Sequence, residues 1–158
     1  MTILEERYGL QTTQNNTVSL PFPSVWGIHA TIAARPIVWG TITINSVTGN
    51  RVMGTVNFRG TQIPIQGFWN ENAKQISLNS PYASYSGTLS IFDDAAIRVR
   101  HYTLSGQIVM TPPSPQAGQT GTWVATTNTA LTGNPIISNE LPPVGVFLTS
   151  DLLNQTLR

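Results

Sequence analysis

Cysteine is missing from the 158 residues of this chain, and charged residues are scarce. The lack of cysteine excludes disulfides, a thiolate nucleophile and cysteine-ligated zinc or iron–sulfur sites. Charged residues make up 9% of the chain, against roughly 25% in a typical globular domain. The densest basic stretch is residues 98–101, RVRH, which is too short to follow a phosphate backbone. Nucleic acid is therefore not expected as a partner.

Long apolar runs are missing too. The longest, such as residues 145–148, fall far short of the 18 or more residues that a membrane helix needs, so no membrane partner is expected. Residues 1–10, MTILEERYGL, lack a basic start followed by an apolar stretch of about 7–15 residues, so they do not resemble a secretory signal. We therefore expect cytoplasmic residence by default.

The chain has Thr, Ser, Asn and Gln in place of charge, and apolar residues make up 40% of it. This length suits one domain with one core. Short strand-like segments follow one another at roughly 8–12-residue spacing, separated by turn residues. We expect strands over residues 25–32, 37–45, 51–58, 61–69, 75–79, 85–92, 97–110 and 121–127, with helix plausible only at the two ends. The expected layout is an N-terminal extension (1–17), a β-domain (18–128) and a C-terminal arm packed on it (129–158).

Glycine opens several short runs in which apolar and polar residues alternate. These runs are WGTITI (39–44), MGTVNF (53–58), SGTLSI (86–91), SGQIVM (105–110) and TGTWVA (120–125). Since residues two apart in a strand share a face, each glycine lies on the apolar face. A missing side chain on a concave face lets a strand bend where a sheet closes on itself. The sequence therefore predicts an all-β, up-and-down antiparallel barrel of about eight strands, rather than a flat sandwich.

Three segments within residues 37–128 resemble motifs of the avidin and streptavidin family, among the lipocalin-like (calycin) barrels. They are ITINSVTGNRVMGTVNF, YTLSGQIVM and TGTWVATTN. The resemblance implies a barrel that binds a small molecule. The family's opening Gly-x-Trp strand, with its ligands for biotin, has no clear counterpart, since SVWGIHA is only a loose match. Biotin is therefore not carried over as the ligand. GTVNFRGTQIPIQGFW also resembles a strand pair of small bacterial mannan-binding lectins, but their duplicated module is absent.

Aromatic residues line the open mouth of ligand-binding barrels. We therefore expect non-enzymatic binding of a small molecule or a sugar in or at the mouth of the barrel. The candidate contacts are Trp123 and Trp69 as walls, with Tyr85, Tyr102 and Asn70 as polar edges. A simpler interpretation stays open, in which Trp69 and Trp123 only fill the core and Trp39 packs in a subunit contact or under a loop.

Two other functions stay open. The first is a structural or interaction protein with a plugged barrel, whose uncharged outer face self-associates as a homo-oligomer or binds another protein. The second is a barrel-type isomerase or cyclase that uses His101 with Asp93 or Asp94, although the two aspartates also suit a simple turn. The chain contains no HExxH, GxSxG, P-loop or strand-linked GxGxxG motif. We therefore predict no catalytic residue, metal ligand or cofactor. An open cavity would distinguish a ligand-binding barrel from a plugged one.

Overall fold

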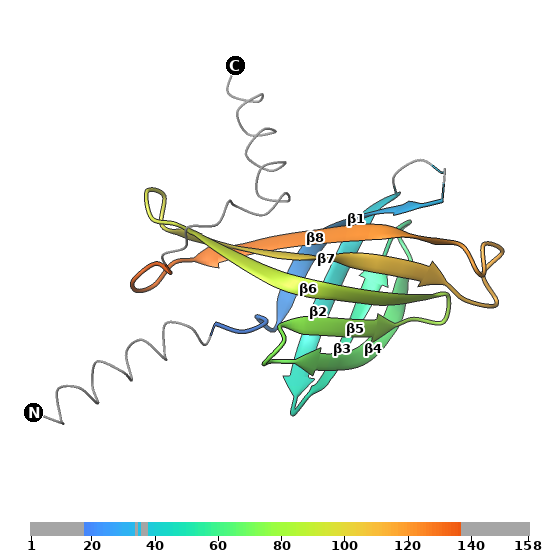
Figure 1. Ribbon diagram of the computed structural model, residues 1–158, viewed down its shortest axis with the longest axis horizontal. Coiled ribbons are helices and arrows are strands. Elements are labelled where there is room, and N and C mark those ends of the chain that lie inside the picture. Colours follow the sequence, from blue (N-terminus) through green and yellow to red (C-terminus); the bar gives the residue numbers. More distant parts are fainter. Residues whose placement is uncertain (1–17, 34, 36–37, 137–158) are drawn as a thin grey trace, which may run out of the picture.

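The computed structural model describes residues 18–33, 35 and 38–136 of the chain (Figure 1). Its eight strands are antiparallel, follow one another in chain order and close into a barrel through the pairing of β1 with β8. They are β1 (Ser24–Ile32), β2 (Val38–Thr48), β3 (Arg51–Asn57), β4 (Gln62–Asn70), β5 (Gln75–Asn79), β6 (Ala83–Asp94), β7 (Val99–Met110) and β8 (Thr120–Ala130). The predicted all-β, up-and-down barrel is thus confirmed. The segments expected to form terminal helices lie outside the described residues. The described residues contain no helix that is long and apolar enough to cross a membrane.

Alternate connections of an up-and-down barrel lie at opposite ends. We call one end the open end; it carries the β1–β2 connection together with residues 58–61, 80–82 and 111–119. We call the other the closed end; it carries residues 49–50, 71–74 and 95–98, together with the flanking segments 18–23 and 131–136. Strands β6 and β7 are the longest, with 12 residues each, and at the closed end they project together with β8, whose Ala130 pairs with Val99 (Figure 1).

Glycines on the inner face let neighbouring strands approach each other more closely than any side chain would allow. A Cβ atom added at Gly54, Gly67, Gly106 or Gly121 would lie 2.0, 1.7, 1.9 or 1.8 Å from a backbone oxygen of the adjacent strand. A Cβ atom at Gly27, on the outer face, would meet nothing within 4 Å. The close approach explains why glycine recurs on the inner face, mostly within the strands rather than at their starts. The sequence pattern did not include Gly67, because the apolar residues Phe68 and Trp69 follow it, whereas a polar residue follows the glycine in the five runs.

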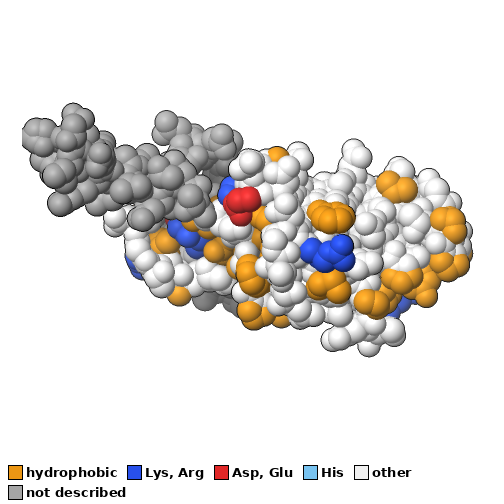
Figure 2. Space-filling view, turned by 90° about the horizontal axis from the view of Figure 1, so that it is seen from below, with side chains coloured by type: hydrophobic (Ala, Val, Ile, Leu, Met, Phe, Trp, Pro, Cys, Tyr) orange, Lys and Arg blue, Asp and Glu red, His pale blue; other side chains and the backbone are white. Residues whose placement is uncertain are grey.

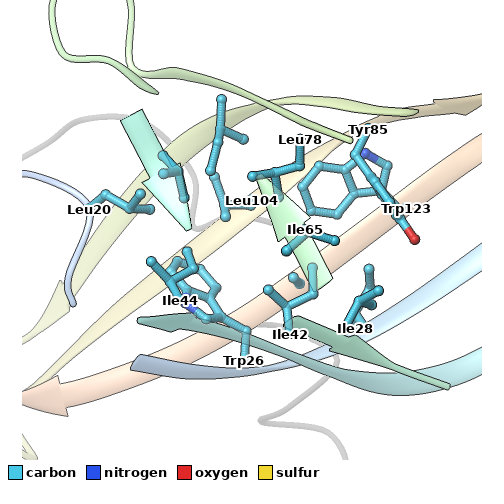
Figure 3. Close-up of a cluster of buried hydrophobic side chains, with 14 of the residues drawn as sticks. Leu20, Trp26, Ile28, Ile42, Ile44, Ile65, Leu78, Tyr85, Leu104 and Trp123 are labelled. Carbon is cyan, nitrogen blue, oxygen red and sulfur yellow. The ribbon is translucent and has the colours of Figure 1, made fainter. Parts of the chain in front are cut away.

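The core fills the barrel between its two ends. The largest fully buried side chains include Trp26, Ile28, Ile42, Ile44, Leu104 and Trp123 (Figure 3). Burial alternates along the strands, as in β4, where Ile65 is 2% exposed and Phe68 is 57% exposed. Full burial of an aliphatic side chain contributes about 1.5–3 kcal/mol, so this inner face supplies most of the stability of the barrel.

Trp123 occupies the space that two paired glycines leave free. Gly87 and Gly106 are partners in the β6–β7 register, and a Cβ atom at Gly87 would lie 2.7 Å from Cζ2 of Trp123. The indole Nε1–H donates to the carbonyl oxygens of Ser86 at 3.1 Å and Gln107 at 2.9 Å. Trp123 is therefore a core residue whose polar atom is already satisfied by the backbone.

The segment before β1 covers the closed end. Leu20 is 3% exposed and belongs to the core cluster, at the opposite side of Figure 3 from Trp123. The Glu71 carboxylate accepts hydrogen bonds from Trp69 Nε1 at 2.9 Å, from the Ser19 hydroxyl and from the Lys74 ammonium. Lys74 Nζ also donates to the carbonyl oxygen of Val18 at 3.0 Å. These contacts fix residues 18–20 across the end of the barrel.

A second set of contacts anchors the chain after β8 to the extended β6–β7 hairpin. Arg100 donates through Nε and Nη2 to the Asp93 carboxylate, at 2.6 and 2.8 Å. The Asp93 carboxylate also accepts the Ile136 backbone N–H at 2.7 Å. Arg98 Nη2 donates to the carbonyl oxygens of Leu131 at 3.0 Å and Gly133 at 2.7 Å. Residues 131–136 are thus held against this hairpin, while residues 129–130 of the expected C-terminal arm belong to β8 and residues 137–158 lie outside the described residues.

Candidate functional site

A cavity of about 490 Å³ lies inside the barrel and opens at the open end. Its wall is formed mainly by apolar side chains, and six strands contribute: Ala30, Val38, Val56, Ile63, Ala83 and Ile108. Small-molecule sites are mostly apolar clefts of about 300–1,000 Å³. The volume and the lining of this cavity therefore match a site for a small ligand with an apolar body.

Hydrogen bonds hold the rim of the cavity in place. The Thr111 backbone N–H donates to the carbonyl oxygen of Tyr82 at 2.9 Å, which joins two of the connections at the open end. Within residues 111–119, the Ser114 hydroxyl accepts the Gln116 backbone N–H at 3.1 Å, and Gly118 takes a positive φ of 91°. Tyr82 and Gln116 line the cavity. These hydrogen bonds order two of the connections at the rim, residues 80–82 and 111–119.

Phe58 closes one side of the cavity because Gly40 leaves room for it. A Cβ atom at Gly40 would lie 2.8 Å from Cδ1 of Phe58 and 2.2 Å from the carbonyl oxygen of Asn57. The Phe58 side chain packs against the core cluster and lines the cavity. This glycine thus shapes the cavity wall as well as the barrel.

Tyr85 brings a polar group into the otherwise apolar interior. It is 4% exposed and lines the cavity, and its ring stands edge-on to the Trp123 indole, with centroids 5.8 Å apart (Figure 3). Burial raises the pKa of Tyr85 to about 12, since the phenolate is poorly solvated there. At neutral pH the side chain therefore keeps its O–H and can donate a hydrogen bond.

The two ends of the barrel differ in charge. Arg35 and Arg59 line the cavity at the open end. The carboxylates of the described residues, Glu71, Asp93 and Asp94, all belong to connections or strand ends at the closed end. Within residues 18–33, 35 and 38–136, the ion pairs are Glu71–Lys74 and Asp93–Arg100, so neither arginine of the rim is paired with a carboxylate. Among the described residues, both charged side chains at the mouth of the cavity are therefore positive.

The structure does not bring the five predicted contact residues together. Tyr85 lines the cavity. Trp123 lies behind it in the core, and Trp69 lies at the closed end with its indole N–H on Glu71. Tyr102 is 6% exposed and packs edge-on against Trp26, with ring centroids 6.2 Å apart.

Asn70, the fifth predicted contact, lies on the outside of the barrel. Its side-chain oxygen accepts the Ala73 backbone N–H at 3.0 Å and so caps the β4–β5 turn. With Phe68 it borders a hollow of about 410 Å³ on the outer surface of strands β4 to β7. Trp39 also faces outward, as its position relative to Ile42 predicts, and is 64% exposed. It lies against His29, with ring centroids 4.9 Å apart, and borders the mouth of the cavity.

Sequence reasoning missed the residues of the rim, namely Arg35, Phe58, Arg59, Tyr82 and Gln116. The parity of a strand residue tells which face it occupies, but not its height along the barrel. The order of the connections was the usable signal. Once the strands are taken as up-and-down, every second connection lies at the same end, and all five of these rim residues lie in such connections.

The pairing of His101 with Asp93 or Asp94 does not form among the described residues. His101 stacks on its cross-strand partner Phe92, with ring centroids 6.1 Å apart. Asp93 binds Arg100, and Asp94 Oδ1 accepts the Ala96 backbone N–H at 3.0 Å in the turn. The Arg100 side chain is 18% exposed because it binds Asp93. In the described part of the chain, no group of three or more His, Asp or Glu side chains is arranged to hold a metal ion.

The closed antiparallel barrel of eight strands is compatible with the calycin-like architecture that the sequence resemblance implies. Comparisons of the chain with protein-family models, with curated proteins and with solved structures give no match. The barrel and its cavity are therefore the basis for inferring a function.

Proposed function

We propose that this protein is a non-enzymatic binding protein that holds a small molecule in the cavity at the open end of its barrel. The observation that carries the proposal is the cavity itself, about 490 Å³ in volume, with a rim fixed by hydrogen bonds. A barrel with a purely structural role would be more stable if side chains filled this space, so an open cavity favours a binding role. The apolar wall favours a ligand with an apolar body over a sugar, whose hydroxyl groups would lose their hydration there.

Burial of the apolar part of the ligand supplies the affinity. Each CH₂ group that leaves water for an apolar site contributes about 0.8 kcal/mol. Tyr85 adds a hydrogen-bond donor inside the cavity, since its pKa of about 12 keeps it protonated. Because hydrogen bonds tie residues 80–82 to residues 111–119, binding would also lose less conformational entropy at this part of the rim.

Intact-mass measurement under non-denaturing conditions tests the proposal directly. Protein purified from its native source is expected to carry an additional mass that disappears on denaturation. Protein stripped of this mass is expected to bind Nile red, a neutral apolar dye, with a rise in fluorescence.

A pair of variants locates the binding. Ala83 lines the cavity and is 3% exposed, so Ala83→Phe fills part of the space and is expected to abolish dye binding. Val109 lies at the same level on the outside of the barrel and is 40% exposed, so Val109→Phe is the matched control and leaves dye binding unchanged. Circular dichroism verifies that both variants fold. Undiminished dye binding by folded Ala83→Phe would contradict the proposal.

A further inference from the structure

We infer that the ligand is a single-chain amphiphile with an anionic head group, a carboxylate or a phosphate monoester, whose head binds Arg35 and Arg59 while its apolar chain fills the cavity. This inference rests on the proposed binding function. It adds the chemical class of the ligand and its direction of entry.

The charge at the mouth selects the head group. The charged side chains that line the cavity are both arginines, and among the described residues neither is paired with a carboxylate. A guanidinium group presents its N–H donors in a rigid fork that matches the oxygens of a carboxylate or a phosphate. Both arginines repel a cationic head, and a neutral head forgoes their attraction.

The interior fixes the direction in which the ligand enters. Deep in the cavity the wall consists of side chains such as Ala30, Val56 and Ile108, which offer an anion no compensating charge. A buried unpaired charge is strongly disfavoured, whereas an apolar chain gains free energy there. The chain therefore enters first and the head stays between the arginines. The Tyr85 O–H remains available for a hydroxyl or carbonyl oxygen carried along the chain.

The size of the cavity favours one chain. Its volume of about 490 Å³ lies in the lower half of the range of about 300–1,000 Å³ for small-molecule sites. The core, with Trp123 and Leu104 fully buried, blocks the way to the closed end. Two long acyl chains would exceed this space, so a diacyl lipid does not fit.

Four ten-carbon compounds that differ only in the head group test the inference. Decanoate, decyl phosphate, decan-1-ol and decyltrimethylammonium are titrated below their micellar concentrations, against Nile red bound to the full-length protein. Charge-assisted hydrogen bonds predict that at least one of the anions binds about tenfold tighter than the alcohol. The cation is expected to bind most weakly, and the preference for the anion should shrink as salt is added, because a rim charge is screened. Comparison of decanoate with decyl phosphate tells which anion the site prefers.

Three charge-removing variants show whether the rim arginines make this difference. Arg59→Gln and Arg35→Gln are each expected to weaken binding of the anion about tenfold and to leave decan-1-ol unaffected. Arg51→Gln is the control, because Arg51 lies at the start of β3 near the closed end, with its guanidinium 5.9 Å from the Phe68 ring centroid. It should leave both affinities unchanged.

Each contrary result would overturn a different claim. Equal affinity for decanoate, decyl phosphate and decan-1-ol would overturn the anionic head group and leave the binding function intact. An equal loss of anion binding in Arg51→Gln and Arg59→Gln would overturn the role of the rim, since only net charge would matter. Failure of Nile red and of every ten-carbon compound to bind would refute the binding function itself.

Discussion

Single glycines decide where the strands of this barrel come together. Gly106 is one example: it pairs with Gly87 in the register, and a Cβ atom added to it would lie 1.9 Å from the carbonyl oxygen of Ser86. Sequence parity was sufficient to place it on the inner face. Parity does not give the height of a residue along the barrel, so it could not separate Tyr85, which lines the cavity, from Trp123, which lies in the core.

Gly106→Ala is expected to lower the free energy of unfolding by about 3 kcal/mol or more, since overpacking against a rigid backbone allows little relaxation. The added Cβ would lie 1.9 Å from the carbonyl oxygen of Ser86. Gly27→Ala, where the Cβ meets nothing within 4 Å, is the control and should change stability by less than about 0.5 kcal/mol. Urea unfolding of both variants, followed by tryptophan fluorescence, provides the comparison; equal midpoints would disprove the role given to Gly106.

Trp123→Phe is expected to destabilise the barrel by about 2–3 kcal/mol, because it removes an N–H that serves two carbonyl groups and leaves a gap over Gly87. Trp39→Phe is the matched control, since Trp39 is 64% exposed. Thermal unfolding measures both. If the two variants melt at the same temperature, the indole of Trp123 is not the structural element described above.

At the scale of strands and connections, the strands were predictable and the ends of the barrel were not. Alternating apolar residues mark strands such as β3 and β5 directly, because one face of each is buried. A run such as TPPSPQAGQ (111–119) has no such period, so its ordered turns at the rim could not be predicted. The cover at the closed end depends on Ser19 meeting Glu71, a contact between residues far apart in sequence.

Acid is expected to loosen the closed end. Burial alone would raise the pKa of Glu71, but hydrogen bonds from Lys74, Ser19 and Trp69 outweigh it and hold the pKa below its ordinary value of 4.5. The pKa of Asp93 is likewise held below 3.8: burial acts to raise it, but hydrogen bonds from Arg100 and the Ile136 backbone act more strongly. A carboxyl group with a depressed pKa stabilises the fold above its unfolded-state pKa, and this contribution is lost as the pH falls through the folded-state value.

The free energy of unfolding, measured from pH 7 down to pH 3, should therefore decline below about pH 5. Glu71→Gln should show a shallower decline, because one of the two linked groups is gone. The difference will be modest, since the Glu71 side chain is 46% exposed and solvent screens its charge. Superimposable pH profiles of the variant and the unchanged protein would rule out the Glu71 contribution.

At the scale of the whole molecule, the outer surface is unusually poor in charge. The face in Figure 2 is mostly neutral, with separate apolar patches and few charged side chains. Large apolar side chains on the outside include Val25 at 60% exposure and Phe68 at 57%. Such a surface loses little hydration energy on contact with a second copy. The composition of the chain already predicted this property, because charged residues make up only 9% of it.

We therefore expect the protein to self-associate through its outer sheet face. Light scattering at high micromolar concentration should give a mass above that of the 17.1 kDa chain. Phe68→Ser should reduce that mass, whereas Ile97→Ser, at an exposed position in the β6–β7 turn, should not. A monomer under these conditions would remove the expectation of a homo-oligomer.

Leu20 and the Glu71 contacts cover one end of the barrel, and the cavity opens at the other, so within the described residues the cavity has access from one side. Under the proposed binding function, a ligand would enter and leave by that same side. Exchange would then require no separation of paired strands, and its rate would be set by the contacts at the rim.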